Sequence, residues 1–352
     1  MHLTPRAAAP SVSTVEVRTH KRIEYIDILK FFGILFIYAG HYTTSAGLLY
    51  PFVFAFHVPL FFFISGCTET FNRETHIGKN IWKKVTGILL PFYLFAFAAI
   101  VVKALVSGGT PGTVRDYLIL IAKGCIRNTY FASSLWFLSC LFIVSVLFEL
   151  MKLLKSRWVM LLCSLALFAS SVSGFVHFPS VYNIHFAVHY QLYYVIGYLI
   201  FNTTHKCLTS DHRFCRAIIL VTGIVSLVYT GLLFFQYNLF SPLSTLPVLS
   251  EFVPVFTALT AIWFFLLLSY LLRRVKLFAD LGQSTLYFCG SEFLVKSTVN
   301  RFLSLFFTIN MNSGLSALVC SFLLLLGEQK YLVPIESKLF NSLKAKCNTF
   351  FK

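Results

Sequence analysis

Residues 22–66 hold the pattern that decides the fold: RIEYIDILKFFGILFIYAGHY at 22–42 is followed, after a short uncharged link, by PFVFAFHVPLFFFISG at 51–66. Both runs are strongly apolar, which is typical of helices that cross a membrane. Four ionisable residues are set into them: Asp27, Lys30, His41 and His57. Because an ionisable group inside a membrane is costly, each of the four is a candidate functional residue.

The spacing of Lys30 and His41 places them on one face of the first predicted helix. They lie 11 positions apart, so at about 100° per residue they return to within roughly 20° of each other. Asp27 lies on the same stripe. The rise from Lys30 to His41 is about 16 Å, around half of a bilayer core. We therefore predict a channel or binding face with an acid and a base near one end and a histidine near the other.

The composition predicts an all-α, polytopic membrane protein. Of the 352 residues, 57% are hydrophobic and 12% are charged, and the mean hydropathy is +0.77. A soluble domain this apolar could not cover its surface with polar groups. The net charge of +16 lies in short segments between apolar runs, which indicates an anionic membrane surface and not nucleic acid. The nine cysteines show no paired spacing, so neither a disulfide framework nor a structural zinc site is expected.

About ten membrane-spanning helices are predicted, with both termini cytoplasmic. Basic residues gather in alternate connecting segments, as the positive-inside rule requires of cytoplasmic loops. The opposite segments at 44–51, 177–183 and 237–250 are nearly free of them. The predicted spans are 24–43, 52–68, 82–106, 133–152, 158–176, 184–202, 215–236, 252–272, 281–300 and 313–334.

We expect one membrane-embedded domain at 23–336, between a cytoplasmic tail at 1–22 and a basic cytoplasmic tail at 337–352. The segment at 107–132 contains an apolar run that is too short to span. It predicts an interfacial or re-entrant helix on the outer side. Residues 1–20 hold no apolar core of signal-peptide type, so the first span is expected to direct insertion.

This topology places further polar residues in the outer half of the membrane, at a depth comparable with that of His41. They come from the second, sixth and ninth predicted spans, and the sixth carries a pair of histidines one turn apart on one face. These residues are His57, His185, His189, Glu292 and Lys296.

Structural roles compete with functional ones at these positions. Asp27 and Lys30 could form an ion pair that anchors the helix end, and Glu292 and Lys296 could neutralise each other. His57, just before Val58-Pro59, could bind a carbonyl group that the proline frees.

The remaining candidates also have alternatives. His41 could be a boundary residue at the outer interface. His185 and His189 could bind zinc, although the glutamate of an H-E-x-x-H motif is missing. Basic residues at inner helix ends are mostly topology signals, yet three could receive a phosphate-bearing ligand from the cytoplasm: Lys30, Lys83 and Lys84.

Five short motifs occur in an order that resembles a known family. They are Tyr25-Ile-Asp27-Ile-Leu-Lys30 with Gly40-His41, FHVPLFFFISG at 56–66, Leu135-Trp136-Phe137-Leu138, YYVIGY at 193–198 and LGQSTLY at 281–287. Together they resemble the acyltransferase-3 family of integral membrane O-acyltransferases, and most closely its branch of fucose 4-O-acetylase-like proteins. The resemblance covers most of 22–334.

The resemblance implies transfer of an acyl group, usually acetyl, from cytoplasmic acyl-CoA to a hydroxyl of a sugar or envelope polysaccharide. Acetyl-CoA would be the donor substrate, and no metal is expected. The arginine–histidine pair that is essential in the family maps to Lys30 and His41, and lysine lacks the bidentate fork of arginine. The family's R-x-x-R motif is reduced to WKKVTG at 82–87, and a histidine of span nine is replaced in Gly290-Ser291-Glu292.

Within this reading, neutral histidine is the natural base near pH 7, so His41 would deprotonate the acceptor or form a transient acyl-histidine. Asp27 and Lys30 would orient the polar face of the first helix and bind the CoA from the cytoplasmic side. Lys83 and Lys84 are further candidate cofactor-binding residues.

The predicted substrate-binding residues are His57, His185, His189, Trp136 and Glu292. Of these, His57 and Glu292 are candidates for orienting either the catalytic histidine or the sugar.

We expect an enzyme of the bacterial cytoplasmic (inner) membrane whose partners are acyl-CoA, a sugar or polysaccharide acceptor, membrane lipids and glycan-assembly proteins, but not nucleic acid. The main alternative is a secondary transporter or a flippase for a lipid-linked sugar, with the outer histidines as a proton or substrate pathway. No inverted repeat of the kind found in transporters is visible. A non-enzymatic scaffold would leave the aligned Asp27, Lys30 and His41 unexplained.

Overall fold

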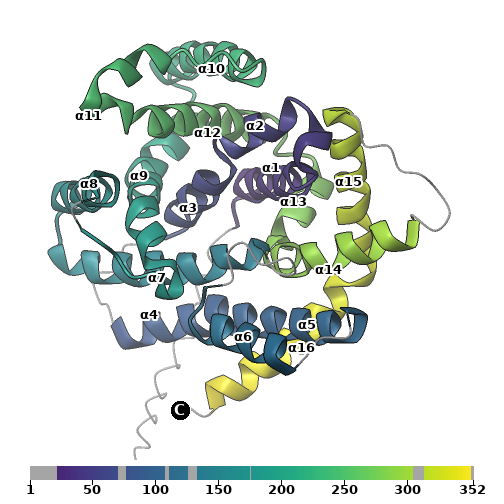
Figure 1. Ribbon diagram of the computed structural model, residues 1–352. Helices are drawn as coiled ribbons and strands as arrows, with labels where there is room; N and C mark the ends of the chain where they lie inside the picture. Colours follow the sequence, from purple (N-terminus) through teal and green to yellow (C-terminus); the bar gives the residue numbers. More distant parts are fainter. Residues whose placement is uncertain are drawn as a thin grey trace, which may run out of the picture.

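The computed structural model describes residues 22–69, 77–107, 111–125, 133–174, 176–303 and 313–349. Within these ranges every regular element is a helix (Figure 1). The all-α class predicted from the sequence is therefore confirmed. Apart from Arg22, the tail expected at 1–22 lies outside the described residues, as does the end of the basic tail at 350–352.

The helices follow one another with short connections. In order, they are α1 (Glu24–Gly40), α2 (Leu49–Phe54), α3 (His57–Cys67), α4 (Ile77–Lys84), α5 (Leu90–Ser107), α6 (Pro111–Ala122), α7 (Trp136–Met151), α8 (Arg157–Ser173), α9 (Ile184–Thr209), α10 (Arg213–Phe234), α11 (Pro247–Ser250), α12 (Val253–Leu271), α13 (Lys276–Gln283), α14 (Thr285–Leu303), α15 (Gly314–Tyr331) and α16 (Val333–Thr349). Between them lie the π-helix η2 (Val85–Leu89) and the 3-10 helices η1 (Thr43–Ala46), η3 (Ser133–Leu135), η4 (Lys152–Leu154), η5 (Val181–Asn183) and η6 (Ser241–Thr245).

A helix lies over the main part of each of the ten predicted spans. In the described part of the chain, five helical segments are long and apolar enough to cross a membrane, and α15 with α16, bent by 53°, would make a sixth. The five are Leu49–Cys67, Ile77–Val102, Trp136–Leu154, Arg213–Phe234 and Val253–Leu271. These are the helices of an integral membrane protein; the ten spans and the cytoplasmic position of both termini stay predictions.

The second predicted span is broken, because α2 ends at Phe54 and α3 begins at His57. Pro59 explains the break: its ring clashes with the carbonyl group four residues earlier, and it has no N–H to donate. Nδ1 of the buried His57 lies 2.9 Å from the carbonyl oxygen of Val53. The imidazole therefore contacts a carbonyl at the end of α2 that also accepts from the Phe56 amide. The carbonyl that Pro59 leaves without an N–H donor is that of Ala55, so the contact of His57 differs from the one that the sequence suggested.

The ninth predicted span, 281–300, is also divided. Helix α13 ends at Gln283, and α14 begins two residues later at Thr285. The short α13 packs against α1, so the chain turns beside the first helix before it continues as α14 (Figure 1). This turn brings residues of α14 next to residues of α1.

Three glycines allow backbones to pass at very short range. A Cβ atom added at Gly66 or Gly197 would lie 1.9 or 2.1 Å from a carbonyl oxygen of the facing helix, so α3 and α9 touch through their backbones. One added at Gly282 would lie 1.7 Å from the carbonyl oxygen of Asp27 on α1. Small residues at helix interfaces permit this approach in membranes. All three glycines belong to the motifs quoted above, so part of what those motifs specify is helix packing.

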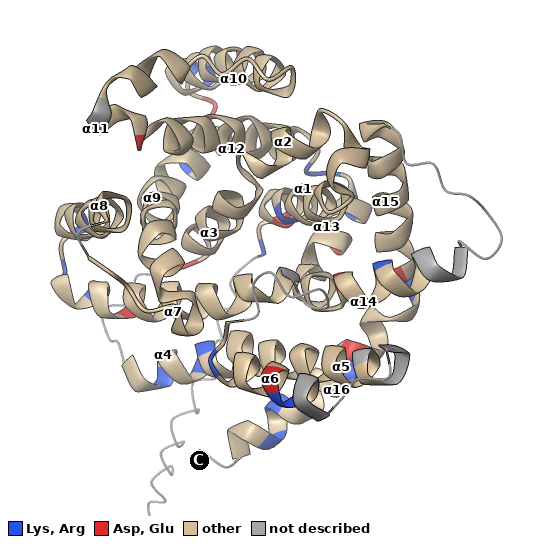
Figure 2. Cartoon of the chain, viewed as in Figure 1, with Lys and Arg blue, Asp and Glu red and all other residues tan. Residues whose placement is uncertain are grey.

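The first helix forms the centre of the bundle. It contacts α3, α12, α13 and α15, and Figure 1 shows it enclosed among them. Helix α10 lies at the edge, packed mainly against α12, and exposes a broad apolar surface. Most residues of the helices are uncharged (Figure 2). The few buried charges are therefore the features that identify a site.

Replacing Gly197 with alanine should destabilise the protein, because the new Cβ atom would collide with a backbone carbonyl that can move only with α3. Overpacking of this kind costs about 1–3 kcal/mol or more. Gly231→Ala in α10 is the matched control, since a Cβ atom there meets nothing within 4 Å. Thermal unfolding midpoints of the two variants in detergent would be compared; equal midpoints would show that the α3–α9 crossing tolerates a side chain.

Candidate functional site

His41 and Glu292 form a hydrogen-bonded pair between α1 and α14. His41 caps the C-terminal end of α1, and its Nδ1 lies 2.8 Å from Oε1 of Glu292. The Glu292 residue is only 2% exposed, whereas the His41 side chain is 28% exposed. An ionised carboxylate only accepts hydrogen bonds, so this contact assigns the proton of a neutral His41 to Nδ1. Nε2 then keeps its lone pair and can accept a proton.

Lys296 provides the positive charge that a buried carboxylate requires. Its Nζ lies 3.6 Å from Oε1 of Glu292, donates to the carbonyl oxygen of Tyr38 at 2.9 Å and lies 3.9 Å from the centroid of the Tyr42 ring. Lys296 therefore forms the ion pair with Glu292 that the sequence suggested. Because Oε1 of Glu292 contacts both Lys296 and His41, this ion pair is compatible with the hydrogen bond to His41.

A second buried network lies beside this pair and was not predicted. The Tyr38 hydroxyl lies 2.8 and 3.0 Å from the two carboxylate oxygens of Glu328 on α15, and the Ser291 hydroxyl donates to Oε2 of Glu328 at 2.9 Å. These contacts hold α1, α14 and α15 together next to Glu292. A carboxylate inside the last predicted span was the signal that could have identified Glu328.

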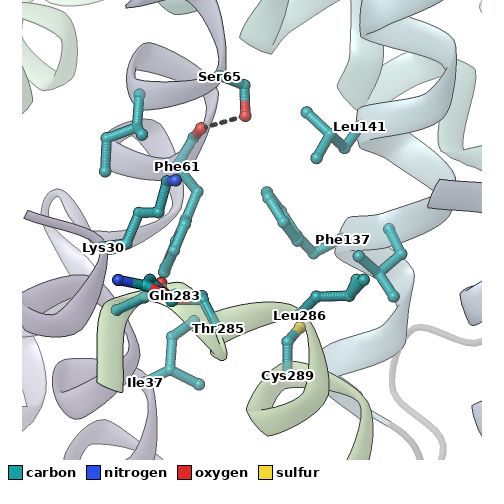
Figure 3. Close-up of a pocket in the computed structure, with 13 residues that line it drawn as sticks. Lys30, Ile37, Phe61, Ser65, Phe137, Leu141, Gln283, Thr285, Leu286 and Cys289 are labelled. Carbon is teal, nitrogen blue, oxygen red and sulfur yellow. Dashed lines mark hydrogen bonds between the residues drawn. The ribbon is translucent and has the colours of Figure 1, made fainter. Parts of the chain in front are cut away.

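A cavity of about 210 Å³ extends along the same face of α1 (Figure 3). Lys30 and Ile37 line it from α1, and Cys289 lines it from α14. Ile37 lies one turn before His41, and Cys289 lies one turn before Glu292, so the cavity runs from Lys30 towards the His41–Glu292 pair. Its other lining residues are Phe61, Ile64, Ser65, Phe137, Leu138, Leu141, Gly282, Gln283, Thr285 and Leu286.

Lys30 is held in place by Asp27. The buried Asp27 carboxylate meets Nζ of Lys30 at 3.0 Å and Nε of Arg22 at 2.5 Å. The anchoring ion pair that the sequence allows is therefore present. It also fixes a partly exposed ammonium group in the lining of the cavity. The catalytic roles predicted for Asp27 and Lys30 stay predictions.

The other predicted histidines do not join His41. The Phe54 ring packs against the imidazole rings of His57 and His41. Its centroid lies 4.8 Å from that of His57 and 6.4 Å from that of His41. His185 and His189 line a different pocket, between α8 and α9. No group of three His, Cys, Asp or Glu side chains that could hold a metal occurs among the described residues, so the zinc alternative for the His185–His189 pair finds no third ligand there.

Trp136, the remaining substrate-binding candidate, also lies near the second pocket. Its ring centroid lies 5.4 Å from that of Phe186 and 6.2 Å from that of Tyr190. Both of these rings belong to the lining of that pocket. The candidate residues are therefore divided between two places.

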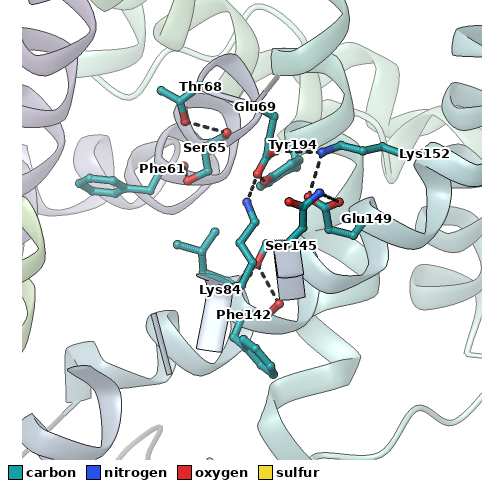
Figure 4. Close-up of polar contacts among 12 residues, drawn as sticks. Phe61, Ser65, Thr68, Glu69, Lys84, Phe142, Ser145, Glu149, Lys152 and Tyr194 are labelled. Carbon is teal, nitrogen blue, oxygen red and sulfur yellow. Dashed lines mark hydrogen bonds and ion pairs between the residues drawn. The ribbon is translucent and has the colours of Figure 1, made fainter. Parts of the chain in front are cut away.

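A third polar cluster joins the end of α3 to α4, α7 and α9 (Figure 4). Glu69 is paired with Lys84, accepts from Nζ of Lys152 at 3.2 Å and accepts from the Tyr194 hydroxyl at 2.7 Å. Lys152 also donates to Glu149 at 2.8 Å. Two carboxylates and two ammonium groups therefore balance each other among these helices.

The cluster bears on the predicted cofactor-binding lysines. The ammonium group of Lys84 is engaged by Glu69, and the π-helix Val85–Leu89 begins at the next residue. Lys83 is exposed. A phosphate-binding role for either lysine stays a prediction, and for Lys84 it would require an exchange of partners.

Comparison with known proteins identifies a family. The acyltransferase-3 family model, described as an acyltransferase domain, matches residues 23–327. No curated protein and no solved structure matches the chain. The match supports the family that the five motifs indicate, and the fucose 4-O-acetylase-like branch stays a prediction.

Breaking the third cluster at one partner should be costly. Lys152→Met would leave the buried Glu149 without its nearest cation, and removing one member of a buried ion pair costs about 3–5 kcal/mol. The double variant Glu149→Gln/Lys152→Met should recover much of this loss. Unfolding in detergent would be measured, with the exposed Lys206→Met as control; a single variant as stable as this control would contradict the structural role of the pair.

Proposed function

Because the chain belongs to the acyltransferase-3 family, we propose that it is an integral O-acyltransferase of the bacterial cytoplasmic membrane. It transfers an acyl group, acetyl in the first instance, from cytoplasmic acyl-CoA to a sugar hydroxyl of a cell-envelope polysaccharide or lipid-linked glycan. The observation that carries the proposal is the 2.8 Å contact between His41 and the buried Glu292. Ile37 and Cys289, each about one helical turn before a member of this pair, line a cavity that Lys30 also lines.

His41 is the general base of the proposed reaction. A sugar hydroxyl must lose its proton as its oxygen attacks the thioester carbonyl carbon, and neutral imidazole suits this task near pH 7. With Nδ1 bound to Glu292, Nε2 takes the proton. As the new C–O bond forms and the C–S bond breaks, the proton passes from Nε2 to the sulfur of CoA. Glu292 orients the ring and stabilises the imidazolium that exists between these steps.

Lys30 and the cavity supply the donor side. CoA carries phosphate groups at one end of a long flexible arm and the thioester at the other. Lys30, held by Asp27, would meet a phosphate group as a point charge. The mostly apolar cavity would receive the arm. The distance along α1 from Lys30 to His41 is about 16 Å, and the arm would cover it to bring the thioester towards the base.

Replacing His41 with glutamine should reduce acyl transfer by about 10²–10⁴-fold, the range that a general base contributes. Membranes containing the protein would receive acetyl-labelled CoA, and label would be measured in lipid-linked and polysaccharide fractions. Glu292→Gln should reduce the rate less, because the imidazole remains but loses its orienting charge. His212→Gln, an exposed histidine at the start of α10, is the control and should leave the rate unchanged.

Two results would contradict this assignment. Wild-type transfer by well-expressed His41→Gln membranes would exclude His41 as the base. No turnover of acyl-CoA with any acceptor, by the unaltered protein, would contradict acyl transfer and return attention to transport of a lipid-linked sugar.

Replacing Lys30 with alanine should mainly raise the KM for acetyl-CoA, by about 10-fold or more, because a contact with the donor phosphate would be lost. Lys30→Arg should keep most of the affinity, since the charge is retained. Initial rates at varied acetyl-CoA would give kcat and KM separately. A fall in kcat with unchanged KM in the alanine variant would place Lys30 outside donor binding.

A further inference from the structure

A second pocket, of about 560 Å³, lies between the end of α8 and the beginning of α9. Its volume falls in the range of small-molecule sites, about 300–1,000 Å³. The catalytic scheme above does not use it.

The polar lining of this pocket suits a ligand rich in hydroxyl groups. His177, His185 and His189 line it together with Ser171 and Ser180. A neutral imidazole and a hydroxyl can each donate and accept a hydrogen bond, as each sugar hydroxyl does. Among the lining residues that the structure describes, none is Lys, Arg, Asp or Glu. The pocket therefore favours a neutral polyol over a phosphate, a uronic acid or an amine.

Aromatic rings supply the other half of a sugar site. Phe178, Phe186 and Tyr190 line the pocket, and flat rings offer an apolar surface to the C–H face of a pyranose. Neutral hydrogen-bonding groups and aromatic surface in one hollow are the combination that a sugar ring requires.

The loop between Ser180 and His185, two residues that line the pocket, is strained but firmly held. Tyr182 and Asn183, which follow Ser180, have positive φ angles of 50° and 56°. Asn183 Nδ2 donates to the carbonyl oxygen of Gly124 at 2.9 Å, and the Tyr182 amide donates to that of Lys123 at 2.7 Å. Strained backbone persists only where its surroundings over-determine it, and it clusters at functional sites. The loop is thereby preformed.

The pocket adjoins the cavity that leads to His41. The Tyr190 ring stacks on Phe62 with centroids 4.6 Å apart, and Phe62 lies 5.1 Å from Phe137, which lines the cavity. The fully buried Phe62 and its two ring neighbours thus form a packed wall shared by the pocket and the cavity.

We propose that this pocket binds a neutral pyranose residue of the acceptor glycan, other than the residue that is acylated. This inference rests on the proposed acyl transfer. It identifies the acceptor as an oligomeric or lipid-linked glycan that contains neutral sugar rings. The protein would bind this glycan both in the second pocket and at the proposed catalytic site.

Direct binding to the full-length protein in detergent tests the proposal without acyl-CoA. Methyl glycosides of glucose, galactose, mannose, fucose and N-acetylglucosamine would be screened by saturation-transfer NMR, with methyl glucuronide as the charged comparison. At least one neutral glycoside should bind more tightly than the glucuronide. His189→Ala should weaken that binding about 10-fold or more, and so should His177→Ala, which alters an exposed side chain and leaves the fold intact. His212→Ala and His41→Gln should bind as the wild type does.

Three results would overturn the subsite: no saturation transfer to any neutral glycoside, equal affinity in the wild type and both pocket variants, or tighter binding of the glucuronide. Loss of binding in His41→Gln but not in the pocket variants would also overturn it, by placing the sugar in the catalytic cavity alone. The proposed reaction is tested separately. If it is wrong, membranes containing the protein will transfer no acetyl group, and the glycoside-binding measurements will be unaffected.

Discussion

A charge among apolar helices must be paired, and this requirement governs how the bundle is assembled. Glu292 on α14 binds His41 of α1 and lies close to Lys296. Asp27 is shared by two cations on the N-terminal side of α1. Glu69 joins the end of α3 to basic residues of two other helices. Each polar group therefore fixes the position of a helix, and in the first case the groups that align the helices are also those proposed to act on the substrate.

Several of these features could be predicted from the sequence because they depend on local periodicity. The helices follow from the apolar runs, and the shared face of Lys30 and His41 follows from a spacing of 11 residues. The partner of His41 is 251 residues away, and no local rule connects the two. The predicted topology gave Glu292 and the four histidines a common depth, but depth does not specify direction around a helix. The structure consequently separates them: His57 binds the carbonyl of Val53, and His189 lines another pocket.

The breaks within predicted spans also have local causes, but a search for long apolar runs does not detect them. A proline at position 59 divides the second predicted span, and a short turn divides the ninth. Glycines that look like mere interruptions of apolar runs prove to be contact points, since Gly66, Gly197 and Gly282 each face a backbone carbonyl. Motifs that resemble those of a family thus combine two kinds of information, one about chemistry and one about packing, and only three-dimensional contacts distinguish them.

The π-helix at Val85–Leu89 has a consequence for register. A turn of this kind accommodates one residue more than an α-helical turn, so the segment after it is rotated by about 100° relative to an uninterrupted helix. Before the insertion, α4 faces α7; after it, α5 faces α14, where the Phe95 ring lies against Gly290, two residues before Glu292. One long helix thereby presents differently oriented surfaces to two neighbours. A single-residue deletion within 85–89 would make it a continuous α-helix and turn Phe95 away from the site.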